Sequence, residues 1–306
     1  MKVLLAAAAD ADRWREAFAA RLPGATIAVW PDAPPEADYA LVWRAPADLF
    51  ARVRVRRAIF NLGAGVDALL AVPGLPAGVP VLRLEDAGMA EQMAEYAALA
   101  VLRAFRDAEH YAREQRAGRW TPLPRRDKRD FRVGLLGAGV LGRAVARTLT
   151  VLGFPLAAWS RTPHAIAGAA VYAGIESLRP FLASVRVAVA LLPSTPATRG
   201  LLDAERLSWL PEGAHLVNAG RGDLVVDADL VAALDSGRIA SATLDVYRAE
   251  PLPPEHPFWH HPGIVMTPHV SALTRIAESA DQVAAKIAAI ERGEPVSGVV
   301  DRARGY

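Results

Sequence analysis

Short apolar segments alternate with longer amphipathic segments along almost the whole chain. In the first part, the apolar runs predict β-strands at 2–8, 25–30, 39–43, 57–61 and 79–84. A second series predicts strands at 132–136, 156–159, 169–172, 185–192, 214–218, 241–245 and 264–266. Strands that alternate with helices are typical of parallel sheets with helices on both faces, so we expect an α/β protein.

The pattern changes between these two series. From Met89 to about Ala117 there is no Gly or Pro, and apolar residues recur at helical spacing, which predicts one long helix. A polar connector with prolines, 118–130, follows it, and a last amphipathic helix is predicted at about 272–292. We expect two doubly wound parallel-sheet domains. The predicted substrate domain is flavodoxin-like (1–98 plus 273–306), and the inserted domain is a dinucleotide-binding Rossmann domain (99–272).

Composition excludes several classes of protein. Apolar residues make up 52% of the 306 residues and charged residues 22%, as in globular proteins, and no apolar run is long enough for a membrane span. The absence of cysteine excludes disulfides, thiolate metal sites and cysteine nucleophiles. The first apolar run stops at Asp10, and we interpret it as a strand rather than a signal peptide, so we expect a cytoplasmic protein.

Charge gives no indication of nucleic-acid binding. The formal net charge is only +2, and the basic residues are scattered. The one dense run, Arg125 to Arg129, is interrupted by Asp127 and followed by Asp130. We interpret it as a solvated linker and expect neither nucleic acid nor a membrane as a partner.

A glycine-rich loop carries the strongest local signal. The predicted strand at 132–136 runs into Gly137-x-Gly139-x-x-Gly142, and an Ala/Val-rich helix begins at once. The first glycine permits a tight turn, the second lets the backbone approach a pyrophosphate, and the third lets helix and strand pack closely. The helix N-terminus, at Val140 and Leu141, offers N–H groups to the anion. This order predicts a dinucleotide site.

The next strand bears on the choice of dinucleotide. About 20 residues after the loop, an NAD site usually carries an Asp or Glu for the ribose 2′-hydroxyl. Here the strand ends in Ser160, Arg161 and Thr162, so the acid is missing. A guanidinium and two hydroxyls suit a 2′-phosphate, which a carboxylate would repel. We therefore predict NADP (NADPH), with NAD less favoured.

Three further segments follow predicted strand ends, where α/β sheets place their ligand-binding residues. They are Val217–Asp223, Leu244–Leu252 and Ile264–Val270. With the glycine loop they resemble the D-isomer-specific 2-hydroxyacid dehydrogenase family over essentially the whole chain. The resemblance rests on an Asn-x-x-Arg-Gly turn, an Asp-Val-x-x-x-Glu-Pro segment and a Thr-Pro-His motif, in this order. Three more segments resemble the family's reductases of glyoxylate and hydroxypyruvate: Asn61–Asp67, Glu250–Pro254 and Val300–Tyr306.

The resemblance implies roles for the residues of these motifs, and their chemistry suits the roles. Arg221 would bind the substrate carboxylate with its planar fork and polarise the keto oxygen. His269 would be the general acid that protonates this oxygen, and Glu250 would orient the imidazole and favour its protonated form. Asp245 and the backbone near Ala219 would face the carboxamide of the nicotinamide.

Other residues are assigned more loosely. The glycine-rich turn at 61–67 would bind the substrate carboxylate through the N–H groups of Ala64 and Gly65, and Trp43 is a candidate wall of the substrate pocket. Leu192 and Pro193 would line the cofactor site. The remaining six histidines have no motif support, and neither Cys nor His-Glu-x-x-His accompanies them, so no metal is expected.

The activity implied is reduction of a small 2-keto acid, such as glyoxylate or hydroxypyruvate, to the 2-hydroxy acid (glycolate, glycerate) by hydride transfer from NADPH. Two alternatives remain open at this point. One is a different or longer keto acid, although no extra basic cluster at 43–67 favours a phosphorylated substrate. The other is a dinucleotide-sensing protein of the co-repressor type, which the presence of Arg221, Glu250 and His269 disfavours. A homodimer is the usual state in the family, and the helix at 89–117 is a candidate interface.

Overall fold

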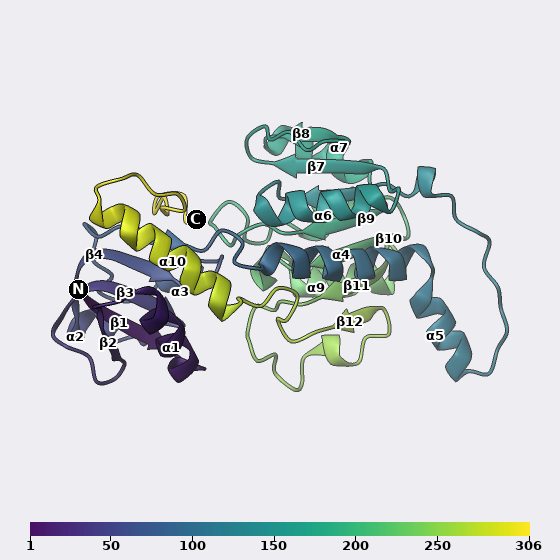
Figure 1. Cartoon of the computed structure of the whole chain (residues 1–306). Coiled ribbons are helices and arrows are strands. Elements are labelled where there is room, and N and C mark those ends of the chain that lie inside the picture. Colours follow the sequence, from purple (N-terminus) through teal and green to yellow (C-terminus); the bar gives the residue numbers. More distant parts are fainter. The chain divides into compact units, whose positions relative to one another are not determined.

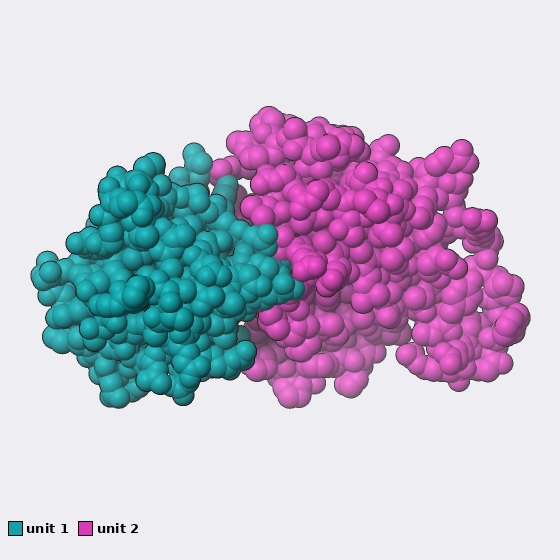
Figure 2. Space-filling view, viewed as in Figure 1, with its two compact units in different colours: residues 1–89, 274–306 teal, residues 90–273 magenta.

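The computed structural model describes all 306 residues, which form two compact units. The first unit contains residues 1–89 and 274–306, and the second contains residues 90–273 (Figure 2). The expected boundary at 98/99 lies inside helix α4 (Met89–Phe105). Because α4 buries Met93, Ala97 and Val101 in the core of the second unit, most of this helix belongs to that unit.

The first unit is built on a five-stranded parallel sheet. Its strand order is β2-β1-β3-β4-β5, the flavodoxin-like order predicted from the sequence. The strands are β1 (Lys2–Ala7), β2 (Thr26–Val29), β3 (Glu36–Trp43), β4 (Arg54–Asn61) and β5 (Val81–Arg83). The helices are α1 (Ala11–Arg21), α2 (Leu49–Arg52), α3 (Asp67–Leu70) and α10 (Ile276–Glu291).

The C-terminal helix α10 packs in this first unit. It lies against α1, where Arg21 Nε is 2.5 Å from Asp281 Oδ1 (Figure 1). The buried Tyr39 hydroxyl of β3 donates to Glu291 at 2.6 Å, which connects the sheet to the end of α10. The tail then reaches β5, where Val299 pairs with Leu82. Residues from both ends of the chain therefore complete one core.

The second unit is built on a seven-stranded parallel sheet. Its order is β12-β11-β10-β9-β6-β7-β8, which confirms the doubly wound architecture expected from the sequence. The strands are β6 (Val133–Leu136), β7 (Leu156–Ser160), β8 (Ala169–Ala173), β9 (Val187–Ala190), β10 (Ala214–Asn218), β11 (Ile239–Leu244) and β12 (Ile264–Met266). All four residues of β6 and of β9 are buried, as expected for central strands covered on both faces.

Helices cover both faces of this sheet. Helix α4 and α6 (Val140–Val151) lie side by side over one face (Figure 1). The other face is covered by α7 (Leu178–Ala183), α8 (Ala204–Ser208) and α9 (Asp227–Asp235). The carboxyl ends of the strands are left for the loops that carry the predicted site residues.

The single helix predicted at 89–117 is wrong. The chain breaks after α4, at Asp107, which adopts a left-handed backbone (φ 54°), and α5 (Ala108–Arg116) then begins. The Asp107 carboxylate binds the Arg126 guanidinium, with Arg126 Nε 3.1 Å from Oδ1, and this long-range pair has no signature in the local pattern. Helix α5 and the loop after it extend away from the sheet (Figure 1).

Candidate active site

The glycine loop joins β6 to α6. Gly137 has φ +119°, a backbone region that favours glycine. A Cβ at Gly142 would lie 2.1 Å from the Gly137 carbonyl oxygen, so the helix can approach the loop this closely only with glycine at this position. A Cβ at Gly139 would meet no atom within 4 Å. Gly137 is therefore favoured by its backbone conformation, Gly142 by close packing, and Gly139 by the open space that it leaves beside the loop.

The open space at Gly139 fits a dinucleotide pyrophosphate. Gly139 caps α6, and the first turn of any helix leaves N–H groups without an intrahelical acceptor, here those of Val140, Leu141 and Gly142. The positive end of the helix dipole points the same way. A group with negatively charged oxygens can approach this backbone, where a side chain would otherwise stand.

The end of β7 lacks the acidic residue of an NAD site. Ser160 is buried, and its Oγ donates to the Thr162 carbonyl at 2.7 Å, which holds the turn. The side chains of Arg161 and Thr162 are exposed beyond it. A cation and a hydroxyl therefore stand where an NAD site usually carries an acid.

The loop after β9 lies beside the glycine loop, because β9 and β6 are neighbours in the sheet. Leu192 is buried, and the Thr198 hydroxyl donates to the Pro193 carbonyl at 2.6 Å, which fixes this turn. Both residues thus occupy the edge of the sheet at which a cofactor would lie.

Asn218 builds the turn that carries Arg221. Its Nδ2 donates to the Arg221 carbonyl at 2.9 Å, and its Oδ1 accepts from the Gly220 N–H at 3.2 Å. Asn218 is buried, whereas Arg221 is partly exposed, with Nη1 donating to the Gly220 carbonyl at 2.8 Å. The asparagine of the motif is therefore structural, and the arginine is the residue presented.

Two glycines allow this turn to pack closely against neighbouring backbone. A Cβ at Gly220 would lie 2.7 Å from the Leu192 carbonyl oxygen. A Cβ at Gly222 would lie 1.9 Å from the Tyr247 carbonyl carbon. The Arg221 turn is therefore packed between the loop after β9, which lies at the cofactor edge, and the segment after β11, which carries Glu250.

His269 and Glu250 are joined by a hydrogen bond. His269 Nδ1 is 2.7 Å from Glu250 Oε2, and Glu250 Oε1 accepts from the Tyr247 N–H at 3.0 Å. The imidazole is 44% exposed, and its Nε2 makes no hydrogen bond within the protein. The pair therefore presents one ring nitrogen outward while the carboxylate holds the other. This is the arrangement required of a general acid.

Asp245, predicted to face the nicotinamide carboxamide, is completely buried. Its Oδ1 accepts from the Thr267 hydroxyl at 2.6 Å and from Val270 N–H at 2.9 Å, and its Oδ2 accepts from Ser271 N–H at 2.9 Å. Its carboxylate thus supports the loop on either side of His269. A contact with the carboxamide stays a prediction.

In the first unit, Asn61 closes the predicted carboxylate-binding turn. Its Nδ2 donates to the carbonyls of Gly63 and Gly65, at 2.9 and 2.8 Å. A Cβ at Gly63 would lie 2.3 Å from the Trp43 ring, so the ring packs directly on the turn. Ala64 and Gly65 are partly exposed. Trp43 therefore supports the turn, a role that the sequence did not indicate.

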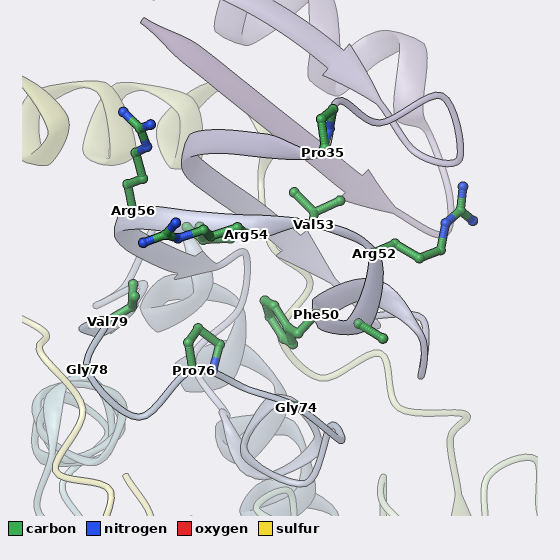
Figure 3. Close-up of a pocket in the computed structure, with 12 residues that line it drawn as sticks. Pro35, Phe50, Arg52, Val53, Arg54, Arg56, Gly74, Pro76, Gly78 and Val79 are labelled. Atoms are coloured by element: carbon green, nitrogen blue, oxygen red, sulfur yellow. The ribbon is translucent and has the colours of Figure 1, made fainter.

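A groove of about 720 Å³ in the first unit lies elsewhere. It is lined by α2, by the loop at 74–79 and by the amino ends of β3 and β4, whereas Trp43 and the turn after Asn61 lie at the carboxyl ends of these strands. Figure 3 shows Arg52 and Arg56 extending away from Phe50 and Pro76. Arg52 stacks on Trp30 and Arg56 pairs with Glu36, so most of the positive charge here is already engaged.

The other histidines form no second centre. His215, in β10, is buried, and its Nδ1 lies 2.8 Å from the Ser241 hydroxyl. Burial, reinforced by Arg126 and Arg186, lowers the pKa of His215 to about 4, so this imidazole is neutral at pH 7. Nowhere do three or more His, Asp or Glu side chains gather as they would around a metal ion. No helix has the length and apolar character to span a membrane.

Fold and site together define a two-domain dehydrogenase that uses a nicotinamide dinucleotide. Residues 98–271 match the family model described as D-isomer specific 2-hydroxyacid dehydrogenase, NAD binding domain. The chain belongs to this family. It is 47% identical over 303 residues to glyoxylate/hydroxypyruvate reductase A of Serratia proteamaculans (strain 568), with 97% of each chain covered.

Solved structures agree with this assignment. A D-isomer specific 2-hydroxyacid dehydrogenase of Xanthobacter autotrophicus Py2, in complex with NADPH and MES, is 43% identical, with a TM-score of 0.95. The NADPH-dependent glyoxylate/hydroxypyruvate reductase of Sinorhizobium meliloti, in complex with NADP and sulfate, is 34% identical, with a TM-score of 0.94. In both comparisons the match covers 100% of this chain and 99% of the other.

Proposed function

We propose that this protein reduces small 2-keto acids, such as glyoxylate and hydroxypyruvate, to 2-hydroxy acids with NADPH. The observation that carries the proposal is the His269–Glu250 pair, at 2.7 Å, in the same unit as the Arg221 turn and the glycine loop. The relatives named for glyoxylate and hydroxypyruvate, and those solved with NADPH or NADP, support this choice of substrate and cofactor.

The chemistry of each side chain suits a different step of the proposed reduction. Bound NADPH would supply the hydride. The Arg221 guanidinium would bind the carboxylate of the keto acid and polarise its carbonyl. His269 would give the proton at Nε2 to the keto oxygen, while Glu250 stabilises the protonated ring through Nδ1. We assign the N–H groups of Ala64 and Gly65 to a second contact with the substrate carboxylate, and Trp43 to the support of that turn.

The cofactor would be held by the glycine loop at its pyrophosphate and by residues 160–162 at the ribose. Arg161 and the hydroxyls of Ser160 and Thr162 suit a 2′-phosphate, and no carboxylate stands at this strand end to repel it. Leu192, Pro193, Ala219 and Asp245 are assigned to the nicotinamide end. The preference for NADPH over NADH follows from this charge.

A screen of substrates and cofactors tests the proposal. Glyoxylate, hydroxypyruvate, pyruvate and a longer 2-keto acid are each mixed with NADPH or NADH, and the loss of the reduced cofactor's absorbance is followed. We expect the highest kcat/KM with NADPH and either glyoxylate or hydroxypyruvate. Turnover of the longer acid alone would shift the assignment to that substrate, and no turnover at all would refute it.

We further propose a homodimer formed through the segment that protrudes from the second unit. Large side chains are exposed on it: Tyr111 on α5 is 41% exposed, and Trp120, in the loop after α5, is 98% exposed. Leu99, on the preceding helix α4, is 58% exposed. Tryptophan is enriched at protein–protein interfaces, and a second copy of the chain would cover this indole. The cytoplasmic location expected from the sequence stays a prediction.

A further inference from the structure

Three hydroxyl-bearing residues converge on the loop that presents His269. They are Tyr96 of α4, Tyr247 of the segment after β11, and Thr267, which precedes Pro268 and His269. Thr267 is the first residue of the Thr-Pro-His motif, but the motifs alone assign a role to none of the three. Tyr96 is separated from Thr267 by 171 residues, so only the folded chain shows the contact, at 2.7 Å between the two side-chain oxygens.

The direction of the hydrogen bonds follows from the number of protons available. The Thr267 hydroxyl donates its only proton to Asp245 Oδ1 at 2.6 Å, because a carboxylate can only accept. Tyr96 must therefore donate to Thr267 Oγ1. Burial raises the pKa of Tyr96 to about 12, so its phenol keeps this proton throughout the neutral range. The result is a directed chain, Tyr96 to Thr267 to Asp245.

This series of hydrogen bonds ends at the backbone on either side of His269. Asp245 accepts from Val270 and Ser271 N–H, and its carbonyl accepts from the His269 N–H at 2.8 Å. The single proton of the Tyr247 hydroxyl lies between two acceptors, the Leu244 carbonyl at 2.8 Å and the Thr267 carbonyl at 3.0 Å. These contacts fasten the loop on both sides of His269.

These contacts matter because His269 has φ +56°, a left-handed conformation that only a few per cent of residues other than glycine adopt. Such a residue relaxes toward ordinary backbone angles unless its surroundings hold it. A change of this one dihedral angle would rotate the imidazole away from Glu250, although every side chain of the proposed catalytic pair would still be present.

We propose that Tyr96 is a positioning residue for His269, acting through the Thr267 hydroxyl and Asp245. The inference rests on the proposed function, because it assigns His269 as the proton donor. The chain of hydroxyls fixes the loop, the loop fixes the backbone of residue 269, and the imidazole then meets both Glu250 and the substrate oxygen in one orientation.

The kinetic test is a double-mutant cycle with Tyr96→Phe and Thr267→Val. We expect Tyr96→Phe to lower kcat about three- to tenfold, the equivalent of one lost hydrogen bond, while the dissociation constant for NADPH stays within about twofold. Thr267→Val should cost more. The double variant should match Thr267→Val alone, because Tyr96 then has no hydroxyl on which to act.

Two further variants separate positioning from simple packing. Thr267→Ser keeps the hydroxyl and should retain most of the activity, and Tyr96→Phe in that background should again lower kcat. Tyr111→Phe, which removes another phenol from the second unit where it accepts from the Leu123 N–H, should change nothing. An unchanged kcat in Tyr96→Phe, or losses that multiply in the double variant, would overturn the proposal.

A spectroscopic readout keeps this inference separate from the choice of substrate. With histidines labelled at Cε1, the His269 signal is identified by its loss in His269→Asn. In Tyr96→Phe we expect this signal to shift or broaden as the ring samples further orientations. The same change in a protein that reduces no keto acid would refute the proposed function alone. An unchanged signal would refute the role of Tyr96 while leaving the reductase assignment intact.

Discussion

At the scale of single residues, the proposed chemistry depends on which polar atoms are already occupied. Glu250 uses one oxygen on the Tyr247 N–H and the other on His269 Nδ1, so the outward Nε2 is the only imidazole atom left for a substrate. Asp245 shows the opposite case: its carboxylate oxygens already accept three hydrogen bonds from the protein, so it supports the loop that carries His269 at the proposed nicotinamide end.

Glu250→Gln removes the negative charge beside the imidazole but keeps its shape. The protonated ring loses a charged hydrogen bond of about 1.5–3 kcal/mol, so the alkaline limb of the pH–rate profile for reduction should move down by about one to two pH units. Glu255→Gln, an exposed change in the same loop, serves as the control. A profile that stays in place would remove Glu250 from its proposed role.

Arg161→Ala tests the choice of cofactor. Loss of the guanidinium should raise KM for NADPH about 10- to 100-fold and leave KM for NADH nearly unchanged, because only NADPH carries the 2′-phosphate. The measurement is steady-state kinetics with each cofactor. Arg147→Ala on α6 removes another exposed arginine from the same unit and should leave both constants unchanged. Equal effects on the two cofactors would contradict the assignment.

At the scale of elements, each proposed site residue of the second unit lies at or just after the carboxyl end of a strand. Adjacent parallel strands align these ends, so sheet order decides which loops meet. Because β9 lies between β6 and β10, a single strand separates the Arg221 turn from the glycine loop. Gly220 and Gly222 then let the turns pack without the space that a side chain needs.

Burial of His215 in β10 lowers the stability of the folded protein when the pH falls. Its pKa is about 4 in the folded protein and about 6.5 in the unfolded chain, so between these values only the unfolded chain gains the proton. Its contribution to stability is complete above pH 6.5 and is lost as the pH falls toward 4.

His215→Asn should therefore flatten the pH dependence of unfolding. From pH 7 to pH 5, the wild type should lose about 2 kcal/mol more of its free energy of unfolding than the variant does, measured by urea denaturation. His260→Asn, at an exposed histidine, should keep the wild-type dependence. Equal losses in wild type and His215→Asn would show that His215 does not titrate in this way.

At the scale of the whole molecule, α5 and the loop after it cover neither face of the seven-stranded sheet (Figure 1). Polar side chains of this segment pair locally, as Glu114 does with Arg119, while Trp120 is left 98% exposed. Because tryptophan is enriched at protein–protein interfaces, the uncovered indole supports the proposed contact of this segment with a second copy of the chain.

Trp120→Ser should weaken the proposed dimer. Truncation of a buried interface tryptophan costs about 2 kcal/mol or more, and a symmetric dimer loses two of them, so the dimer dissociation constant should rise roughly 1000-fold in sedimentation experiments. Val151→Ser changes another largely exposed apolar residue, 88% exposed at the end of α6, and should have no effect. A wild-type monomer, or a dimer indifferent to Trp120, would refute the proposed interface.

Much of this protein could be predicted from its residues in order. Apolar periodicity located all twelve strands, because burial on both faces leaves continuous apolar runs such as those of β6 and β9. The glycine loop could be predicted because the local backbone conformation and packing require glycine at its positions. The family resemblance added Arg221, Glu250 and His269 as candidate catalytic residues.

The tertiary structure alone decided how these residues are supported. Long-range contacts place the Trp43 ring on Gly63 and connect Tyr96, Thr267 and Asp245 by hydrogen bonds. The break between α4 and α5 depends on the left-handed backbone of Asp107. Local patterns record which face of an element is buried. They do not record which distant hydroxyl or ring meets it there, because that depends on how the elements pack.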